Sequence, residues 1–149
     1  MIVDSHNLEF LIDFLNIAFL NRYRNKARLV IFNLVKKKIR DLYPFSKILG
    51  VADPSTPYKI DNRYKYEKLK QNQIISQVGP GEKADYYLLE YAKNHPNCFI
   101  ISNDAFKEYD IKEQLRKRII PVGIINNEVI FSQKLYAYLQ DEEKIIAKT

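Results

Sequence analysis

The stretch CFIIS at residues 98–102 is short and almost entirely apolar, and Asn103 and Asp104 follow it directly. A continuous apolar run of this length is typical of a strand that is buried on both faces of a sheet. EFLID at Glu9–Asp13 ends in an aspartate, and SKILGVA at residues 46–52 is followed by one. The sequence therefore predicts buried strands whose carboxyl ends carry acidic side chains.

Longer segments with a helical apolar stripe separate these runs, and basic residues gather towards the end of the first of them. The expected helices are at residues 27–42, Arg63–Gln71, 82–94 and 105–118. Further strands are expected at residues 73–77, 119–125 and Glu128–Phe131, the last two forming a hairpin around Asn126 and Asn127. Strands that alternate with helices form parallel βαβ units. We therefore expect one domain over residues 1–149, a three-layer α/β/α sandwich with a mostly parallel, Rossmann-like central sheet.

The composition narrows the chemistry that this domain can perform. The chain has 149 residues with 24 basic and 18 acidic side chains, a net charge of +6, which favours an anionic partner. A single cysteine, Cys98, excludes a disulfide framework and a cysteine-built zinc site, and two histidines disfavour a histidine-rich one. No signal peptide is recognisable, and the apolar run at residues 10–20 is too short to span a membrane. We expect a cytoplasmic protein without membrane association whose chemistry relies on carboxylates, Lys, Arg, Tyr, Ser and Asn.

Four aspartates occupy comparable places in this pattern, namely Asp13, Asp53, Asp85 and Asp104. Ligands of open α/β sheets bind outside the carboxyl ends of the strands, where these side chains would meet. Three of them also have a local interpretation: Asp85 near a helix N-terminus, Asp53 in a turn before Pro54, and Asp104 as a helix cap. Asp13 differs, because an ionised carboxylate inside an apolar run needs a partner or a metal. Clustered carboxylates without His or Cys favour Mg²⁺ or Mn²⁺, which can activate water at a phosphoryl group.

Basic residues follow the strands that end in aspartates. Eight Lys and Arg residues and no acid lie between Asn21 and Arg40, and a second group between Tyr58 and Lys70 alternates with tyrosines. Such side chains neutralise phosphates and stack on unpaired bases, whereas the alternative is an ordinary solvated helix face. The candidate RNA-binding residues are Arg22, Arg24, Lys26, Arg28, Lys59 and Arg63.

Four segments together are similar to PIN-like NYN-domain ribonucleases, with the Regnase-type domain of CCCH zinc-finger ribonucleases as the nearest branch. They are LIDFLNIA at residues 11–18, VADPSTPYKIDNRY at 51–64, GEKADYYLLEYA at 81–92 and FIISNDAFKEY at 99–109. The resemblance covers about residues 9–131 and implies a Mg²⁺-dependent endoribonuclease. It assigns the catalytic and metal-binding acids to Asp13, Asp85 and Asp104, adds Asp53 from prokaryotic relatives, and gives site-shaping roles to Asn16, Ser102 and Asn103.

The sequence also departs from the pattern of that family. Phe14 stands where the family usually has Gly, Ala84 replaces a frequent second Asp, and the chain has no CCCH zinc finger. These departures keep a non-catalytic RNA-binding domain open as an alternative, and a nuclease toxin with an antitoxin-like partner is another. A homodimer is also open. Phosphatases of the haloacid dehalogenase type, response-regulator receivers and Walker-type nucleotide-binding proteins are disfavoured, because their motifs do not occur.

Overall fold

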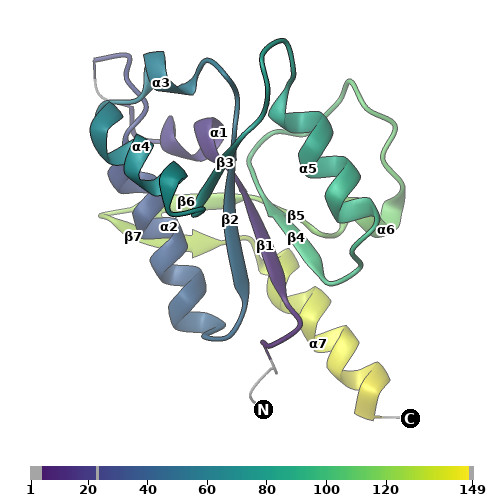
Figure 1. Cartoon of the computed structure of the whole chain (residues 1–149). Coiled ribbons are helices and arrows are strands. Elements are labelled where there is room, and N and C mark those ends of the chain that lie inside the picture. Colours follow the sequence, from purple (N-terminus) through teal and green to yellow (C-terminus); the bar gives the residue numbers. More distant parts are fainter. Residues whose placement is uncertain (1–4, 23, 148–149) are drawn as a thin grey trace.

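The structure is a computed structural model that describes residues 5–22 and 24–147, with side chains to residue 140 (Figure 1). Five parallel strands form the central sheet in the order β3-β2-β1-β4-β5. Their bounds are β1 (Glu9–Asp13), β2 (Lys47–Ala52), β3 (Ile75–Gln77), β4 (Cys98–Ile101) and β5 (Ile119–Ile120). Glu9 is in register with Lys47 on one side and Cys98 on the other, so β1 is central and its carboxyl end lies inside the sheet.

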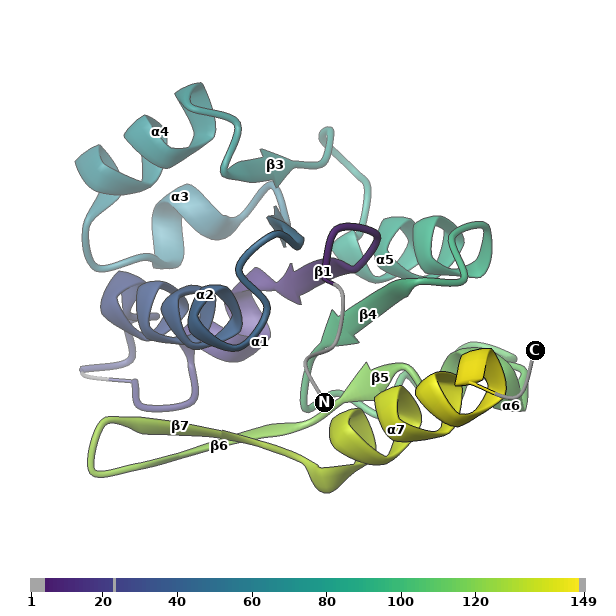
Figure 2. The ribbon, with the colours of Figure 1, turned by 90° about the horizontal axis from the view of Figure 1, so that it is seen from below.

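Helices cover both faces of the sheet (Figure 2). One face carries α1 (Phe14–Ala18), α2 (Leu29–Leu42), α3 (Thr56–Lys59) and α4 (Arg63–Gln71), and the other carries α5 (Ala84–Lys93) and α6 (Glu113–Arg116). Side chains of a strand alternate between faces, so Phe10 and Ile12 join the core on the α2 side whereas Leu11 joins the core beneath α5. Burying a large apolar side chain contributes about 1.5–3 kcal/mol. The two cores therefore hold the ends of β1 and β4 in fixed positions.

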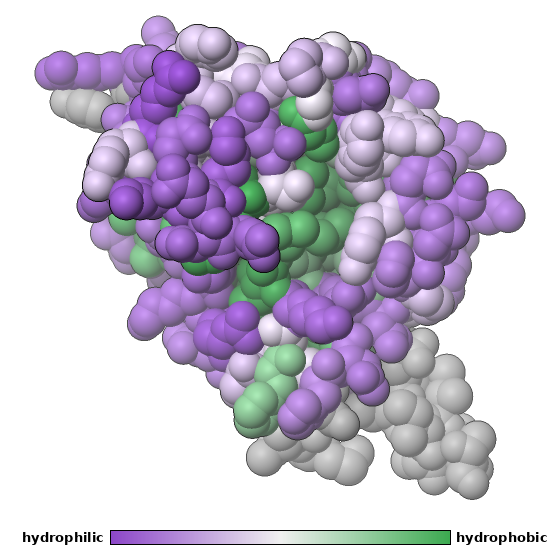
Figure 3. All heavy atoms as spheres, in the orientation of Figure 1, coloured by the Kyte–Doolittle hydropathy of each residue, from purple (hydrophilic) through white to green (hydrophobic). Residues whose placement is uncertain are grey.

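A hairpin of β6 (Val122–Ile125) and β7 (Glu128–Phe131) leads into α7 (Gln133–Ala147), whose Leu135 and Leu139 pack into the core on the α2 side. On the opposite face, α5 leaves part of the sheet uncovered, and an apolar strip is visible between α4 and α5 (Figure 3). None of the helices in the described part of the chain is long and apolar enough to cross a bilayer.

The predicted α/β architecture is confirmed, and two predicted elements are wrong. Residues 105–112 form a loop rather than a helix, and only Glu113–Arg116 is helical. The Asp104 carboxylate accepts a hydrogen bond from the Phe106 amide, and Phe106 has a φ of 49°, which a helix cannot contain. The strand at residues 119–125 is also interrupted, because Pro121 has no amide hydrogen. Its first part joins the central sheet, and its second part forms the hairpin, whose turn residues Asn126 and Asn127 have φ of 50° and 62°.

Candidate active site

Three carboxylates from distant parts of the chain meet at the carboxyl edge of the sheet. Asp13 ends β1, Asp85 lies in the first turn of α5, and Asp104 lies in the loop after β4. One oxygen of each lies within 4.8 Å of the others. Asp13 is buried, Asp85 is half-buried and Asp104 is exposed, so the cluster opens towards solvent on the side of Asp104. An oxygen-lined cluster of this size matches the ligands that Mg²⁺ and Mn²⁺ prefer.

Asp13 is held in an unfavourable electrostatic environment. The pKa of its carboxyl group is raised from 3.8 to about 7, first by burial and then by the charges of Asp85, Asp104 and Asp53, against a hydrogen bond from Ser102 that lowers it. The pKa of Asp85 is raised as well, first by burial and then by the charge of Asp104. A divalent cation would relieve both effects, because it favours the ionised form of each carboxylate.

Ser102 connects two of the three aspartates. Its hydroxyl donates to Oδ2 of Asp13 at 2.8 Å and accepts from the backbone amide of Asp104 at 3.0 Å. The Asp104 carboxylate in turn accepts from the amide of Phe106 at 2.8 Å. These bonds fix the loop after β4 relative to the end of β1, and the site-shaping role of Ser102 stays a prediction.

Asn16 and Asn103 connect the same loop to two other elements. The side-chain oxygen of Asn16, in α1, accepts from the backbone amide of Asn103 at 2.8 Å. The Asn103 side chain donates to the carbonyl of Val122 at 2.8 Å and accepts from its amide at 2.7 Å. Asn103 therefore connects the strand-end loop to the start of β6 by one donated and one accepted hydrogen bond.

Asp53 lies near the cluster but outside the group of three. Its Oδ1 accepts from the backbone amide of Ala84 at 2.7 Å, which satisfies one free donor at the start of α5. This bond places the first turn of α5 and, with it, Asp85. The charge of Asp53 still raises the pKa of Asp13 and of Asp85. Its role as a metal ligand stays a prediction, whereas its positioning contact is observed.

Two of the departures from the family pattern, Phe14 and Ala84, are buried side chains that pack in the core. Phe14 begins α1, is fully buried and packs against Phe32 and Tyr66 at ring-centroid distances of 4.9 and 5.5 Å. Positive φ values in the described chain fall elsewhere, so this turn does not need glycine. Ala84 is buried with Leu88 in the core beneath α5. An apolar side chain at this position therefore has a structural reason.

The sequence did not indicate the loop residues beside the cluster. A cavity of about 430 Å³ lies against the acidic site, and Lys107, Glu108 and Tyr109 line it together with Asp85 and Asp104. Glu108 raises the pKa of Asp85, and Lys83 lowers it. Because residues 105–112 carry a helical pattern, nothing in the sequence indicated that they would turn towards the strand ends.

The structure brings together two basic segments that are about thirty residues apart in the sequence. Ala27 and Ile60 form a parallel β-bridge, and the Lys26 ammonium donates to the carbonyl of Tyr58 at 3.2 Å. Within the first segment, Arg28 donates to the carbonyl of Asn21 at 3.3 Å. The exposed residues Arg22, Arg24, Lys59 and Arg63 belong to the same segments.

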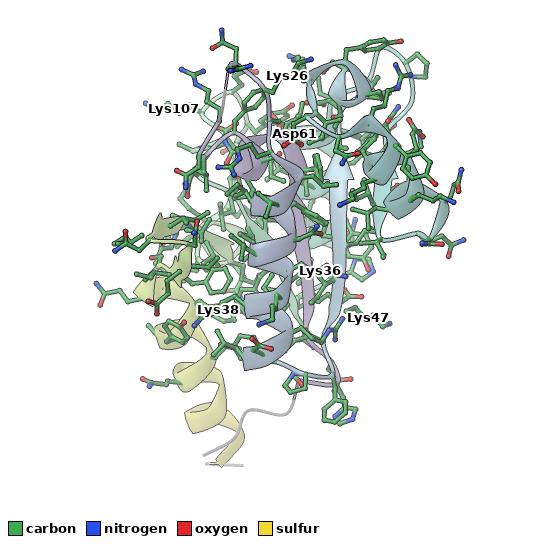
Figure 4. All side chains as sticks on the ribbon, turned by 90° about the vertical axis from the view of Figure 1, so that its left-hand side faces the viewer. Lys26, Lys36, Lys38, Lys47, Asp61 and Lys107 are labelled. Carbon is green, nitrogen blue, oxygen red and sulfur yellow. The ribbon has the colours of Figure 1, made fainter. Side chains whose placement is uncertain are left out.

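Not all of the basic residues lie in this region. In Figure 4, Lys26 and Lys107 lie at one end of the molecule, whereas Lys36 and Lys38 lie further along α2 and Lys47 lies towards the other end. Arg40 donates to the carbonyls of Pro44 and Ser46, so it closes the end of α2. The structure therefore separates the basic run at residues 21–40 into a part at the carboxyl edge and a part remote from it.

Comparison with known proteins gives structural matches alone: no family model and no curated protein sequence matches the chain. Two structures of nuclear proteinaceous RNase P 2 from Arabidopsis thaliana align with TM-scores of 0.65 and 0.66 at 16% identity, over 84% of this chain and 29% of theirs. The PIN domain endonuclease Utp24 aligns with a TM-score of 0.42 at 14% identity, over 83% of this chain and 90% of its own.

The likeness to the RNase P protein defines the fold, and the chain spans less than a third of that protein. The PIN-like α/β fold expected from the sequence is thereby confirmed, and an acidic cluster suited to a divalent cation lies at its strand ends. The assignment to the Regnase-type branch stays a prediction from the sequence motifs.

Proposed function

We propose that the protein is a metal-dependent endoribonuclease in which Asp13, Asp85 and Asp104 hold Mg²⁺ or Mn²⁺. The observation that carries this proposal is the convergence of three carboxylates within 4.8 Å, one of them buried. Three like charges at this separation repel one another, and a cation is the general way to stabilise them in their ionised form. The donors are all oxygens, which fits a hard cation better than zinc.

The residues around the cluster have different roles in such a site. When bound, a divalent cation supplies Lewis acidity to a phosphodiester and lowers the pKa of water. Ser102 holds the Asp13 carboxylate in place, and the hydrogen bond that the Ala84 amide donates to Asp53 holds the end of α5 that carries Asp85. Lys107 and Lys83 lie next to the acids and offer positive charge to a substrate phosphate.

RNA is the proposed substrate for two reasons. The basic segments around Lys26 and Lys59 are joined by the bridge between Ala27 and Ile60, and Figure 4 places Lys26 at the same end as Lys107. The structural match to proteinaceous RNase P adds a ribonuclease as a neighbour of the same fold. Cytoplasmic location, homodimerisation and an antitoxin-like partner stay predictions from the sequence.

The test is cleavage of labelled single-stranded RNA, hairpin RNA and single-stranded DNA in Mg²⁺, Mn²⁺ or EDTA. We expect RNA cleavage that needs the metal and that falls by at least about a hundredfold in Asp104→Asn, because that change removes a charge from the metal site. Asp41→Asn is the matched control, since Asp41 pairs with Lys37 on the exposed side of α2. A folded Asp13→Asn/Asp104→Asn protein that cleaves RNA as fast as the Asp41→Asn control would refute the proposal.

A non-catalytic RNA-binding domain would give a different result in the same assay. The protein would bind RNA, Mg²⁺ would not stimulate cleavage, and the aspartate variants would show the same absence of cleavage as the wild type. Phe14 and Ala84 motivated that alternative, and the buried positions of both side chains explain them without loss of the acidic cluster. The geometry therefore favours the catalytic function.

A further inference from the structure

Two tyrosines at the start of the α3–α4 region are unusually exposed. Tyr58 and Tyr64 each have 72% of their surface accessible, whereas Tyr66 is fully buried and its hydroxyl donates to Gln77 at 2.7 Å. The tyrosines that alternate with basic residues in this segment are therefore of two kinds. Tyr66 is a core residue, and the other two present their rings to solvent, where a binding partner can reach them.

A cation lies over each exposed ring. The Arg63 guanidinium is 5.2 Å from the centroid of Tyr58, and the Lys68 ammonium is 5.6 Å from the centroid of Tyr64. Cations at these distances restrain the rings without covering them, as the exposure shows. The region thus combines two accessible aromatic faces with positive charge beside each of them.

The acidic residues of the same region are already engaged. Asp61 accepts a hydrogen bond from the amide of Leu29 at 3.0 Å, and Glu67 pairs with Lys70 at 3.2 Å. In Figure 3 the surface over α4 is hydrophilic, in contrast to the apolar strip beside it. This charge pattern complements a polyanion that carries flat rings, rather than an apolar protein surface.

The exposed tyrosines also lie close to the proposed active site along the chain. Residues 54–55 connect Asp53, at the end of β2, to α3, and the amide of Thr56 donates to the carbonyl of Asp53 at 3.1 Å. Figure 1 places α3 at the same end of the sheet as α1, which follows Asp13 directly. A nucleic-acid strand that crosses the aspartate cluster can therefore continue onto the surface of α3 and α4.

We propose that Tyr58 and Tyr64 form a stacking platform for unpaired bases of single-stranded RNA, with Arg63 and Lys68 holding the adjacent phosphates. The inference rests on the proposed function only for the choice of RNA as the polymer. Paired bases in a duplex have no free faces, so the platform selects single-stranded segments. It thereby assigns a substrate preference to residues that lie outside the acidic cluster.

The experiment measures binding in EDTA, so that it does not depend on cleavage. The probes are a fluorescein-labelled oligouridylate, an abasic RNA of equal length and charge, and an RNA duplex. Tyr58→Ala and Tyr64→Ala are expected to weaken binding of the oligouridylate about tenfold each and to leave binding of the abasic strand unchanged. Tyr58→Phe is expected to bind like the wild type, because the ring is retained. Phe45→Ala is the matched control, since Phe45 is 63% exposed and lies next to the amino end of β2.

Several results would overturn the platform. These are alanine variants that bind the oligouridylate as the wild type does, equal losses for the abasic strand, or a duplex that binds as tightly as the single strand. If the alanine variants bind RNA as the wild type does, the exposed rings do not bind RNA and a protein partner is the alternative. If the wild type cleaves RNA in a metal-dependent way but the alanine variants bind the oligouridylate normally, the platform is refuted and the nuclease proposal stands. Binding that follows the expected pattern without any cleavage would refute the nuclease proposal and support the platform.

Discussion

Replacing Asp13 by Asn should stabilise the metal-free protein at alkaline pH. Asp13 is only 6% exposed, and burial is the largest cause that raises its pKa. The unfolded chain releases this proton near pH 3.8, whereas the folded protein keeps it up to about pH 7. Between these values the folded state binds more protons than the unfolded state, so its stability falls as the pH rises. The neutral amide of Asn avoids this penalty.

The size of the effect follows from the two pKa values. A rise from 3.8 to about 7 corresponds to about 4 kcal/mol at 1.36 kcal/mol per pKa unit. This full penalty applies at about pH 8, and less than about 2 kcal/mol remains at about pH 5. The amide oxygen of Asn can still accept the hydrogen bond from Ser102, so we expect the variant to gain about 2–4 kcal/mol at about pH 8.

Urea denaturation in EDTA at the two pH values measures this difference directly. The expected gain corresponds to about 4–16 °C in the melting temperature, so thermal scans provide a second measurement. Asp41→Asn is again the control, because it removes an exposed charge and should change stability by less than about 0.5 kcal/mol. If the stability of Asp13→Asn relative to wild type is the same at both pH values, Asp13 is not a buried carboxylate that keeps its proton in the folded state.

Three further predictions concern the surroundings of Asp13. Ser102→Ala removes the hydrogen bond that lowers the pKa of Asp13, so the pH profile of cleavage should shift to higher pH. Urea denaturation should show a free energy of unfolding that is lower by about 1–3 kcal/mol. Asp53→Ala should lower the free energy of unfolding by about 1 kcal/mol and reduce cleavage, because the start of α5 that carries Asp85 loses its acceptor. Asp53→Asn keeps this acceptor and should cleave more RNA than Asp53→Ala does. Equal loss of cleavage in both variants would instead identify Asp53 as a metal ligand. Mg²⁺ at a hundred times its Kd should stabilise the wild type by about 2.7 kcal/mol and leave Asp13→Asn/Asp104→Asn unchanged, as thermal scans with and without EDTA would show.

Local sequence patterns were sufficient to predict most strands of the sheet and several helices. The predicted bounds are correct for three elements, Glu9–Asp13, Arg63–Gln71 and Glu128–Phe131. An apolar run indicates a strand that is buried on both faces, and a helical apolar stripe indicates a helix that is buried on one face. The convergence of Asp13, Asp85 and Asp104 follows from parallel topology, which brings strand ends to one edge. These predictions needed no knowledge of contacts between distant segments.

The errors arose where a few side-chain bonds outweigh the local pattern. Residues 105–112 have apolar residues at helical spacing, yet the bond between Asp104 and the Phe106 amide turns the chain, and buried Phe106 anchors the turn. The helix α1 was not predicted either, because five residues are too few to show a period. Its formation matters, since it brings Asn16 to the amide of Asn103.

Residue type alone does not distinguish a ligand from a residue that positions one. In the sequence, Asp53 and Asp104 look equivalent, as each follows an apolar strand. In the structure, Asp104 offers an oxygen to the cluster, whereas Asp53 uses an oxygen to hold the amide of Ala84 at 2.7 Å. The difference comes from α5, whose first turn lies next to the end of β2 and presents a free backbone donor to whichever acid is nearest. An acid at that position therefore has a structural reason even if it binds no metal, and the asparagine variant separates the two roles because it keeps the acceptor and removes the charge.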